Sequence, residues 1–260
     1  MKLVVVGRGK VGKTLARAAR HAGVEASNVS GRAPSSRTLR DAELVLLAVP
    51  DAAIAEAGSV VASLAPGAAI VHCAGALGPD ALAAAAAGGA SVGAMHPLVS
   101  FADAKHPPSL EGALFLIDGA PRAVALATRF ARAVGARPVT QPAHGPAYHA
   151  AAALAANGAA ALAFHAVELL DRLGVDRAAA TSGIAALLAS VAENVRTVGV
   201  PSALTGPIAR GDAETVRAHR RAVAMDPAFG AAYDGVAEAV LGCAEATGLS
   251  PERSAAVRAA

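Results

Sequence analysis

A short apolar strand that runs into a glycine-rich turn constrains the fold of this chain more than any other feature. Residues 3–7 read LVVVG, which is typical of a strand buried on both faces, and a helical pattern begins near Val11. The turn between them has the spacing GxGxxG. Strand, glycine turn and helix in this order point free helix amides at a pyrophosphate, so the motif predicts a dinucleotide site. The predicted contacts are Gly7, Arg8, Gly9, Lys10, Val11 and Gly12.

The segment after the second predicted strand indicates which dinucleotide binds. Enzymes that use NAD commonly place an acidic residue there for the ribose hydroxyls, but residues 30–37 read SGRAPSSR and contain no acid. An arginine and a hydroxyl, Arg32 and Ser35, would suit a 2′-phosphate. We therefore expect NADP(H) in preference to NAD(H). The alternative is that the arginines of this loop are only solvated surface charges.

Apolar runs alternate with helical patterns through the first half of the chain. Predicted strands cover residues 3–7, 25–30, 44–49, 69–73, 91–95, 114–117 and 137–140, and the later predicted helices cover 146–173, 177–198, 213–224, 227–247 and 251–258. Alternation implies crossover connections, and the strand signal ends after Pro142. The predicted fold is α/β, a Rossmann doubly wound and mainly parallel sheet followed by an all-α C-terminal domain. We place the domains at residues 1–141 and 142–260.

Composition narrows the functional class. The 260 residues are 54% hydrophobic and 17% charged, which is typical of a folded protein. The most apolar stretch, near residues 150–170, contains Asn157, His165 and Glu168, so we expect no membrane span. No targeting segment is recognisable, so we expect a cytoplasmic protein. Cys73 and Cys243 show no metal-ligand spacing, and we expect no metal site.

The distribution of charge indicates a small anionic ligand. The first 40 residues hold nine Lys or Arg against one acid, although the net charge of the chain is only +3. A nucleic acid would need a broader basic stripe, commonly with interleaved aromatic residues, and aromatics make up only 3% of the chain. We expect no nucleic-acid partner.

Three predicted strand ends, in residues 48–51, 72–75 and 95–101, should form the reactive edge of the sheet, because ligands of doubly wound folds bind beyond the carboxyl ends of the strands. Ala48, Val49 and Pro50 end one strand and should line the nicotinamide side of the cleft. His96 follows another strand, and an imidazole there could donate a proton near neutral pH. The alternative is that His96 only holds its loop in place.

Polar residues in the alanine-rich helical half supply the remaining candidates. His149 and Asn157 are eight residues apart, which places them on roughly one face of a helix. They could contact substrate, or they could bond another helix within a core. Arg210 could bind a substrate carboxylate, while Asp212 is expected to cap the helix that follows.

With these segments identified, the chain resembles a family of Rossmann-like oxidoreductases that carry a C-terminal helical domain of unknown function. The matching stretches are GRGKVG, LLAVPD, HCAGALG, MHPLVSF, YHAAAALAAN and LTGPIARGD, in this order. The family is similar to pyrroline-5-carboxylate reductases, ketopantoate reductases and β-hydroxyacid dehydrogenases. The resemblance implies an NADP-linked reductase of a small, carboxylate-bearing substrate and a homodimer formed through the helical domain.

One departure from the relatives bears on mechanism. β-Hydroxyacid dehydrogenases and ketopantoate reductases use a lysine one turn before an asparagine on the first helix of the second domain. Asn157 fits that asparagine, but Ala153 stands where the lysine would be, and the helical half contains no lysine. A histidine, His96 or His149, would have to donate the proton instead, while Asn157 and Arg210 would position the substrate.

We therefore expect an NADPH-dependent reductase of a C=O or C=N bond in a small ketopantoate-like or imino or keto acid. Two alternatives stay open at this point. The first alternative is a prephenate- or arogenate-type dehydrogenase, because Met-His-Pro is also similar to a segment of prephenate dehydrogenases in which the histidine contacts the substrate hydroxyl. The second alternative is a non-catalytic sensor that binds a dinucleotide, because the lysine that the relatives use is absent.

Overall fold

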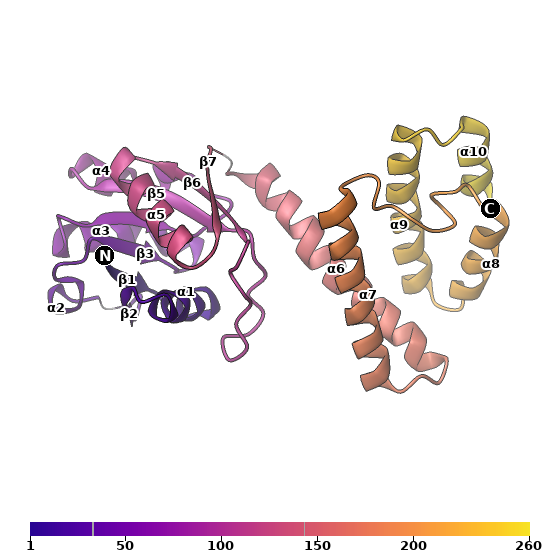
Figure 1. Ribbon diagram of the computed structural model, residues 1–260, viewed down its shortest axis with the longest axis horizontal. Helices are drawn as coiled ribbons and strands as arrows, with labels where there is room; N and C mark the ends of the chain where they lie inside the picture. The colour runs from indigo at the N-terminus through magenta and orange to yellow at the C-terminus, as the bar shows by residue number, and fades with distance from the viewer. Residues whose placement is uncertain (33, 143) are drawn as a thin grey trace. The chain divides into compact units, whose positions relative to one another are not determined.

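The computed structural model describes residues 1–32, 34–142 and 144–260. The chain divides into two compact units, Met1–Leu154 and Ala155–Ala260. The first contains the whole sheet and the second is helical, so the predicted fold class is confirmed (Figure 1). The predicted domain boundary, between residues 141 and 142, stays a prediction.

The first unit is built on one seven-stranded sheet with the order β2-β1-β3-β4-β5-β6-β7. Every neighbouring pair is parallel except β5 and β6, which run antiparallel. The predicted strands agree with the observed ones to within two residues at each end. Their bounds are β1 Lys2–Val6, β2 Glu25–Val29, β3 Leu44–Leu47, β4 Ala69–His72, β5 Ser91–Pro97, β6 Leu114–Gly119 and β7 Arg137–Thr140.

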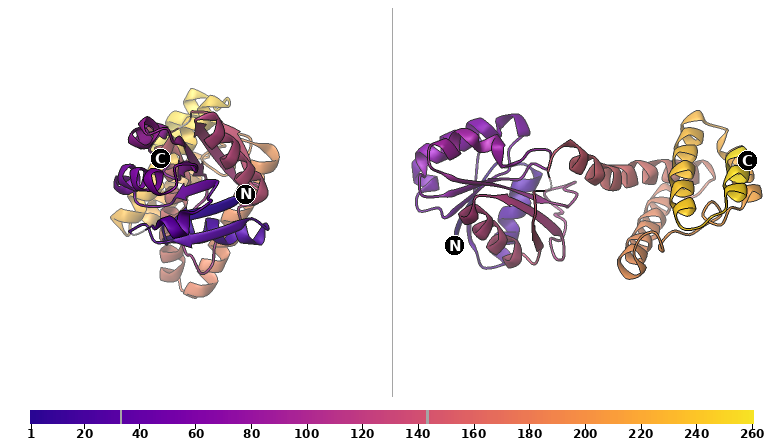
Figure 2. Two further views of the ribbon diagram at one scale, coloured as in Figure 1. Left: turned by 90° about the vertical axis from the view of Figure 1, so that its left-hand side faces the viewer. Right: turned by 90° about the horizontal axis from the view of Figure 1, so that it is seen from above.

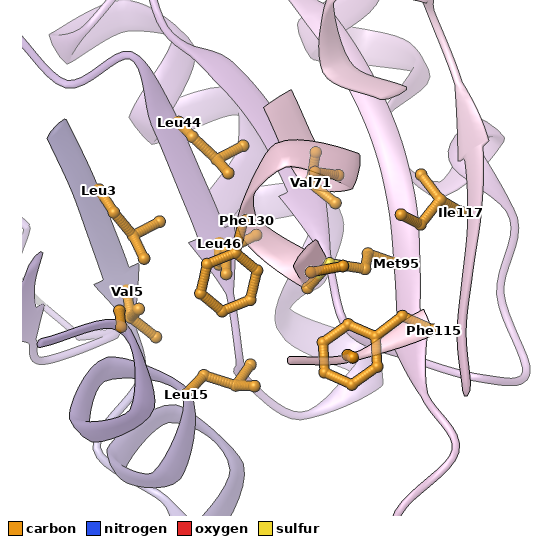
Figure 3. Close-up of a cluster of buried hydrophobic side chains, with 14 of the residues drawn as sticks. Leu3, Val5, Leu15, Leu44, Leu46, Val71, Met95, Phe115, Ile117 and Phe130 are labelled. Carbon is orange, nitrogen blue, oxygen red and sulfur yellow. The ribbon is translucent and has the colours of Figure 1, made fainter. Parts of the chain in front are cut away.

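Helices cover both faces of this sheet, which is why its central strands read as continuous apolar runs. The first unit has α1 Lys10–His21, α2 Ser36–Leu39, α3 Ile54–Leu64, α4 Ala83–Ala87 and α5 Pro121–Ala133, with short 3₁₀ turns η1 Asp51–Ala53 and η2 Pro79–Leu82. Leu15 of α1 and Phe130 of α5 pack on one face, where Figure 3 shows them with Leu3, Leu46 and Met95. Helices α2, α3 and α4 cover the other face, and Figure 2 shows the sheet between the two helical layers.

Strand β5 is longer than the sequence predicts and includes His96. The prediction ended the strand at Met95 and placed His96 in the loop beyond it. In the structure, β6 runs antiparallel beside β5 and pairs Met95 with Ile117, His96 with Leu116 and Pro97 with Phe115. Because a neighbouring strand supplies the pairing, β5 continues past the point where its own apolar run stops.

The second unit consists of the rest of a long helix and four further helices. They are α6 Pro146–Arg172, α7 Arg177–Val198, α8 Ala213–Val223, α9 Pro227–Ala246 and α10 Pro251–Ala259. A small core formed by α8, α9, α10 and the segment before α8 holds Ile208, Val216, Leu241 and Val257. Asp212 accepts a hydrogen bond from the Thr215 amide at 3.1 Å and caps α8, as the sequence predicts.

Helices α6 and α7 leave most of their apolar side chains exposed. Leu154 is 79% exposed, Phe164 58% and Leu187 58%. Within the described residues, only Val167 of α6 and Ala180 of α7 are buried. Judged by length and composition alone, both helices could cross a membrane. The expectation that they do not rests on their polar residues and stays a prediction.

Candidate functional site

The glycine turn after β1 is packed directly against the end of β3. Gly7 has a φ of +119°, and a Cβ at this position would lie 2.1 Å from the carbonyl oxygen of Ala48. A Cβ on Gly12 would lie 2.0 Å from the carbonyl oxygen of Gly7 and 3.3 Å from the Cβ of Ala48. Neither position has room for a side chain, so helix α1 begins directly against the strand end.

Gly9 differs from its two neighbours, because a Cβ there would meet no atom within 4 Å. This glycine therefore faces open space at the start of α1, where the backbone can approach a ligand closely. Arg8 and Lys10 beside it are exposed, and Val11 is half-buried. The turn thus has the cradle that a pyrophosphate requires, and the residues named for it in the sequence lie together.

Asn28 of β2 braces this turn and was not predicted from the sequence. Its side-chain amide donates to the carbonyl oxygens of Val5, at 3.0 Å, and Gly7, at 2.7 Å. One bond ties β2 to the end of β1 at Val5, and the other fixes the direction of the Gly7 carbonyl. A polar amide in a short strand beside the motif is the sequence signal that could have indicated this role.

The residues proposed for a 2′-phosphate lie in the loop between β2 and α2. Arg32 is exposed. The Ser35 hydroxyl accepts from the Thr38 amide at 3.3 Å and caps the short helix α2. Gly31 lies beside the end of β3, since a Cβ on it would be 2.9 Å from a methyl carbon of Val49. This brings the loop next to the Ala48–Val49–Pro50 segment.

His96 and Tyr148 are in direct contact at the end of β5. The Nδ1 atom of His96 lies 2.6 Å from the Tyr148 hydroxyl, and the two rings meet edge to face with centroids 5.3 Å apart. Burial, with a smaller contribution from the nearby His149, lowers the pKa of His96 to about 4, whereas Asp51 acts in the opposite direction. Burial also raises the pKa of Tyr148. Near pH 7 the imidazole is therefore neutral and the phenol keeps its proton.

The sequence prediction named His96 and His149 and missed Tyr148, although the tyrosine directly precedes His149. The His149 ring lies edge to face against the His96 ring, with centroids 6.4 Å apart. His149 itself is exposed. Tyr148 is the residue that bonds His96, and because the two are separated by 52 in sequence number, no local sequence pattern indicates their contact.

Two polar contacts hold the start of α6 against the sheet in the first unit. His144 lies 3.6 Å from the Asp118 carboxylate of β6, with both side chains about one-third exposed. The Gly145 amide donates to the carbonyl oxygen of Gly75 at 3.3 Å. Because the contact between His144 and Asp118 is partly solvated, its contribution to stability is modest, and its main effect is to fix where α6 begins.

The two remaining predicted site residues, Asn157 and Arg210, belong to the second unit. Asn157 lies on α6 and Arg210 precedes α8, and both are exposed. Their assignment to the site stays a prediction. Within residues 1–32, 34–142 and 144–260, no three His, Cys, Asp or Glu side chains are grouped so as to hold a metal ion. Cys73 and Cys243 are free thiols.

Residues 113–240, just under half of the chain, match a protein family described as a domain of unknown function, DUF2520. The predicted resemblance to Rossmann-like proteins with a helical C-terminal domain of unknown function is thereby confirmed. No curated protein matches the chain significantly.

Solved structures similar to this chain share its fold over nearly the full length. A Thermotoga maritima protein is 24% identical with a TM-score of 0.64, and the match covers 94% of this chain and 99% of that one. A candidate NADP oxidoreductase from Bacteroides fragilis is 20% identical with a TM-score of 0.70, covering 92% and 97%. A reductive aminase from Aspergillus terreus in complex with NADPH and ethyl levulinate is 16% identical with a TM-score of 0.64, covering 99% and 98%.

The low pKa of His96 predicts that stability depends on pH. The unfolded chain binds a proton at His96 near the ordinary value of 6.5, but the folded protein does so only near 4. The unfolded state therefore gains protons first, and stability is lost as the pH falls from about 6.5 toward 4. We expect the Tm to fall across this range and His96→Gln to reduce that fall, measured by calorimetry at constant ionic strength. Equal pH dependence in both proteins would contradict a neutral, buried His96.

Proposed function

We propose that this protein is an NADPH-dependent oxidoreductase that reduces a C=O or C=N bond in a small carboxylate-bearing metabolite. The glycine turn supports dinucleotide binding. Backbone atoms leave no room for a side chain at Gly7 and Gly12, whereas the space beside Gly9 is free for a ligand. The absence of an acid in residues 30–37 and the presence of Arg32 support the 2′-phosphate form. Fold neighbours described as an NADP oxidoreductase and as a reductive aminase in complex with NADPH support the same chemistry.

The observation that carries the mechanism is the contact between His96 and Tyr148. Bound NADPH would supply a hydride to the carbon of the substrate double bond. The Tyr148 hydroxyl gives its proton to the substrate oxygen or nitrogen, and water later returns a proton to the phenolate. A neutral His96 with its proton on Nδ1 donates to the phenol oxygen, which directs the Tyr148 proton away from the ring and stabilises the phenolate.

This assignment changes the predicted role of the histidines. An imidazole whose pKa is about 4 carries no extra proton at neutral pH, so His96 is poorly suited to act as the donor itself. Tyr148, whose pKa is raised by burial, keeps its proton until a substrate accepts it. His149 contacts the same imidazole and can bind substrate polar atoms. Asn157 and Arg210 are proposed to position the substrate, with Arg210 on its carboxylate.

Removal of the phenolic hydroxyl tests this mechanism. Tyr148→Phe should lower kcat by about 10²-fold or more, since the proton donor is lost, while NADPH binding stays unchanged. Turnover would be followed by NADPH oxidation over a panel of small keto acids and cyclic imino acids.

The chain offers a matched control for this substitution. Tyr233 also makes an edge-to-face contact and a 2.9 Å hydrogen bond with a histidine, His219, in the helical unit. Tyr233→Phe should leave kcat within a few-fold of the wild-type value. Equal losses in the two variants, or full activity in Tyr148→Phe, would remove Tyr148 from the mechanism.

Cofactor preference can be tested at the loop between β2 and α2. Arg32→Ala should weaken NADPH binding about tenfold or more, because a charge-assisted bond to the 2′-phosphate is lost, and should leave NADH binding nearly unchanged. Titration of both cofactors with fluorescence or calorimetric detection measures this. Wild-type protein that binds NADH more tightly than NADPH would overturn the preference.

We also propose that the protein is a cytoplasmic homodimer in which a second copy covers the exposed apolar side chains of α6 and α7. Leu154, Phe164 and Leu187 would each lose contact with water in such an interface. Charged groups interrupt this surface, among them Glu168, which pairs with Arg177. Such ion pairs suit a protein interface better than a lipid environment.

The oligomeric state can be measured by light scattering after size exclusion. We expect twice the mass of the chain for the wild type and a monomer for Leu187→Asp. Val60→Asp is the control, because Val60 is an exposed valine on α3 of the sheet unit, and this variant should stay dimeric. A monomeric wild type, or a wild type that is soluble only in detergent, would contradict the proposal.

A further inference from the structure

His72, at the end of β4, is completely buried and has no role in the mechanism above. Its Nε2 atom lies 2.8 Å from the carbonyl oxygen of Gly78, and its Nδ1 atom lies 3.3 Å from the amide nitrogen of Ala74. One ring therefore spans both ends of the turn at residues 73–78. The turn belongs to the HCAGALG stretch, one of those that carry the family resemblance.

The two partners fix the protonation state of this ring. Because the Ala74 amide can only donate, Nδ1 must accept, so the proton lies on Nε2 and donates to the Gly78 carbonyl. Burial lowers the pKa of His72, which is consistent with a neutral ring. A protonated His72 would lose its bond to Ala74, so the clasp forms only with the neutral side chain.

The turn that His72 clasps supports the residues of the proposed site. A Cβ on Gly75 would lie 2.8 Å from Nε2 of His96, so the backbone of the turn lies directly on the His96 imidazole. The Gly75 carbonyl oxygen accepts from the amide of Gly145, one residue before α6. A Cβ on Gly78 would lie 2.5 Å from Cε1 of His144. The turn thus contacts the His96 ring and the chain that leads into Tyr148.

We propose that His72 is a positioning residue for the pair of His96 and Tyr148: by clasping the turn at residues 73–78, it holds the backbone that orients the His96 ring and shields it from water. This inference rests on the proposed function only in treating Tyr148, with His96 bonded to its hydroxyl, as the proton donor. The contacts of His72 with the turn, and of the turn with the His96 ring, do not depend on any substrate.

Filling the buried space at the end of β4 does not by itself require a histidine at position 72. A leucine could fill the same volume, but it would leave the Gly78 carbonyl and the Ala74 amide without partners in a buried place. The turn would then move away from the His96 ring and admit water. Tyr148, His149 and Asp51 are the other polar groups that act on His96, and none of them lies on the clasped turn.

Three substitutions separate the two hydrogen bonds of the ring. His72→Gln places an amide where Nε2 was and keeps a donor for Gly78, whereas His72→Asn places an oxygen where Nδ1 was and keeps an acceptor for Ala74. His72→Leu keeps neither bond. His21→Gln is the control, because it replaces an exposed histidine of α1, outside the turn.

The decisive measurement is the titration of the His96 ring by NMR in the full-length protein without cofactor or substrate. The wild type and His21→Gln should titrate near the low pKa of about 4. In His72→Leu the His96 pKa should rise by at least one unit toward 6.5, and His72→Gln should show a smaller rise because it keeps the shorter bond. The kcat should fall in the same order. The affinity for NADPH should stay within twofold, since the glycine turn follows β1 and lies outside the turn at residues 73–78.

The possible outcomes distinguish this inference from the proposed function. An unchanged His96 titration in the folded His72 variants would overturn it even if the protein proves to be a reductase. If His72→Leu does not fold, the Gln and Asn variants still measure the effect of each hydrogen bond on the His96 pKa. A raised His96 pKa in a protein that reduces no substrate of the panel would support the clasp and count against the proposed function alone.

Discussion

The close approach of backbone to backbone at the glycine turn is the constraint on which the first unit depends. Gly7 and Gly12 leave no space for a Cβ between the start of α1 and the end of β3, and Asn28 fixes the carbonyl of Gly7 from the neighbouring strand. With these contacts, the first helix starts directly against the strand ends. The open face at Gly9 then becomes the place where a phosphate can reach the helix amides.

A second constraint is the burial of uncharged histidines at the same edge of the sheet. Burial lowers the pKa of His72, whose Nδ1 must accept from the Ala74 amide, and burial also lowers the pKa of His96, whose ring is bonded to a phenol. A neutral imidazole can donate or accept a hydrogen bond without the desolvation cost of a charge. This allows the protein to place a hydrogen-bond relay, rather than a buried cation, beside the proposed cofactor.

The helical unit presents a different physical problem. Its compact core lies among α8, α9, α10 and the segment before α8, while α6 and α7 bury one residue each among those the structure describes. Long apolar helices of this kind gain most of their stability from packing against other surfaces. The exposed leucines, valines and phenylalanine of α6 and α7 form the surface that the proposed second copy would cover.

Local patterns in the sequence determined the seven strands, the glycine turn and the cap at Asp212, because strand burial, backbone clearance and capping are properties of short segments. Only the tertiary structure decided what His96 contacts. Strand β6 extended β5 through His96, Tyr148 came from 52 residues away to bond its ring, and the clasp of His72 placed Gly75 against it. No periodicity within a segment records contacts between such distant segments. The protonation states of the histidines follow from burial, which exists only once the sheet and the start of α6 have packed together.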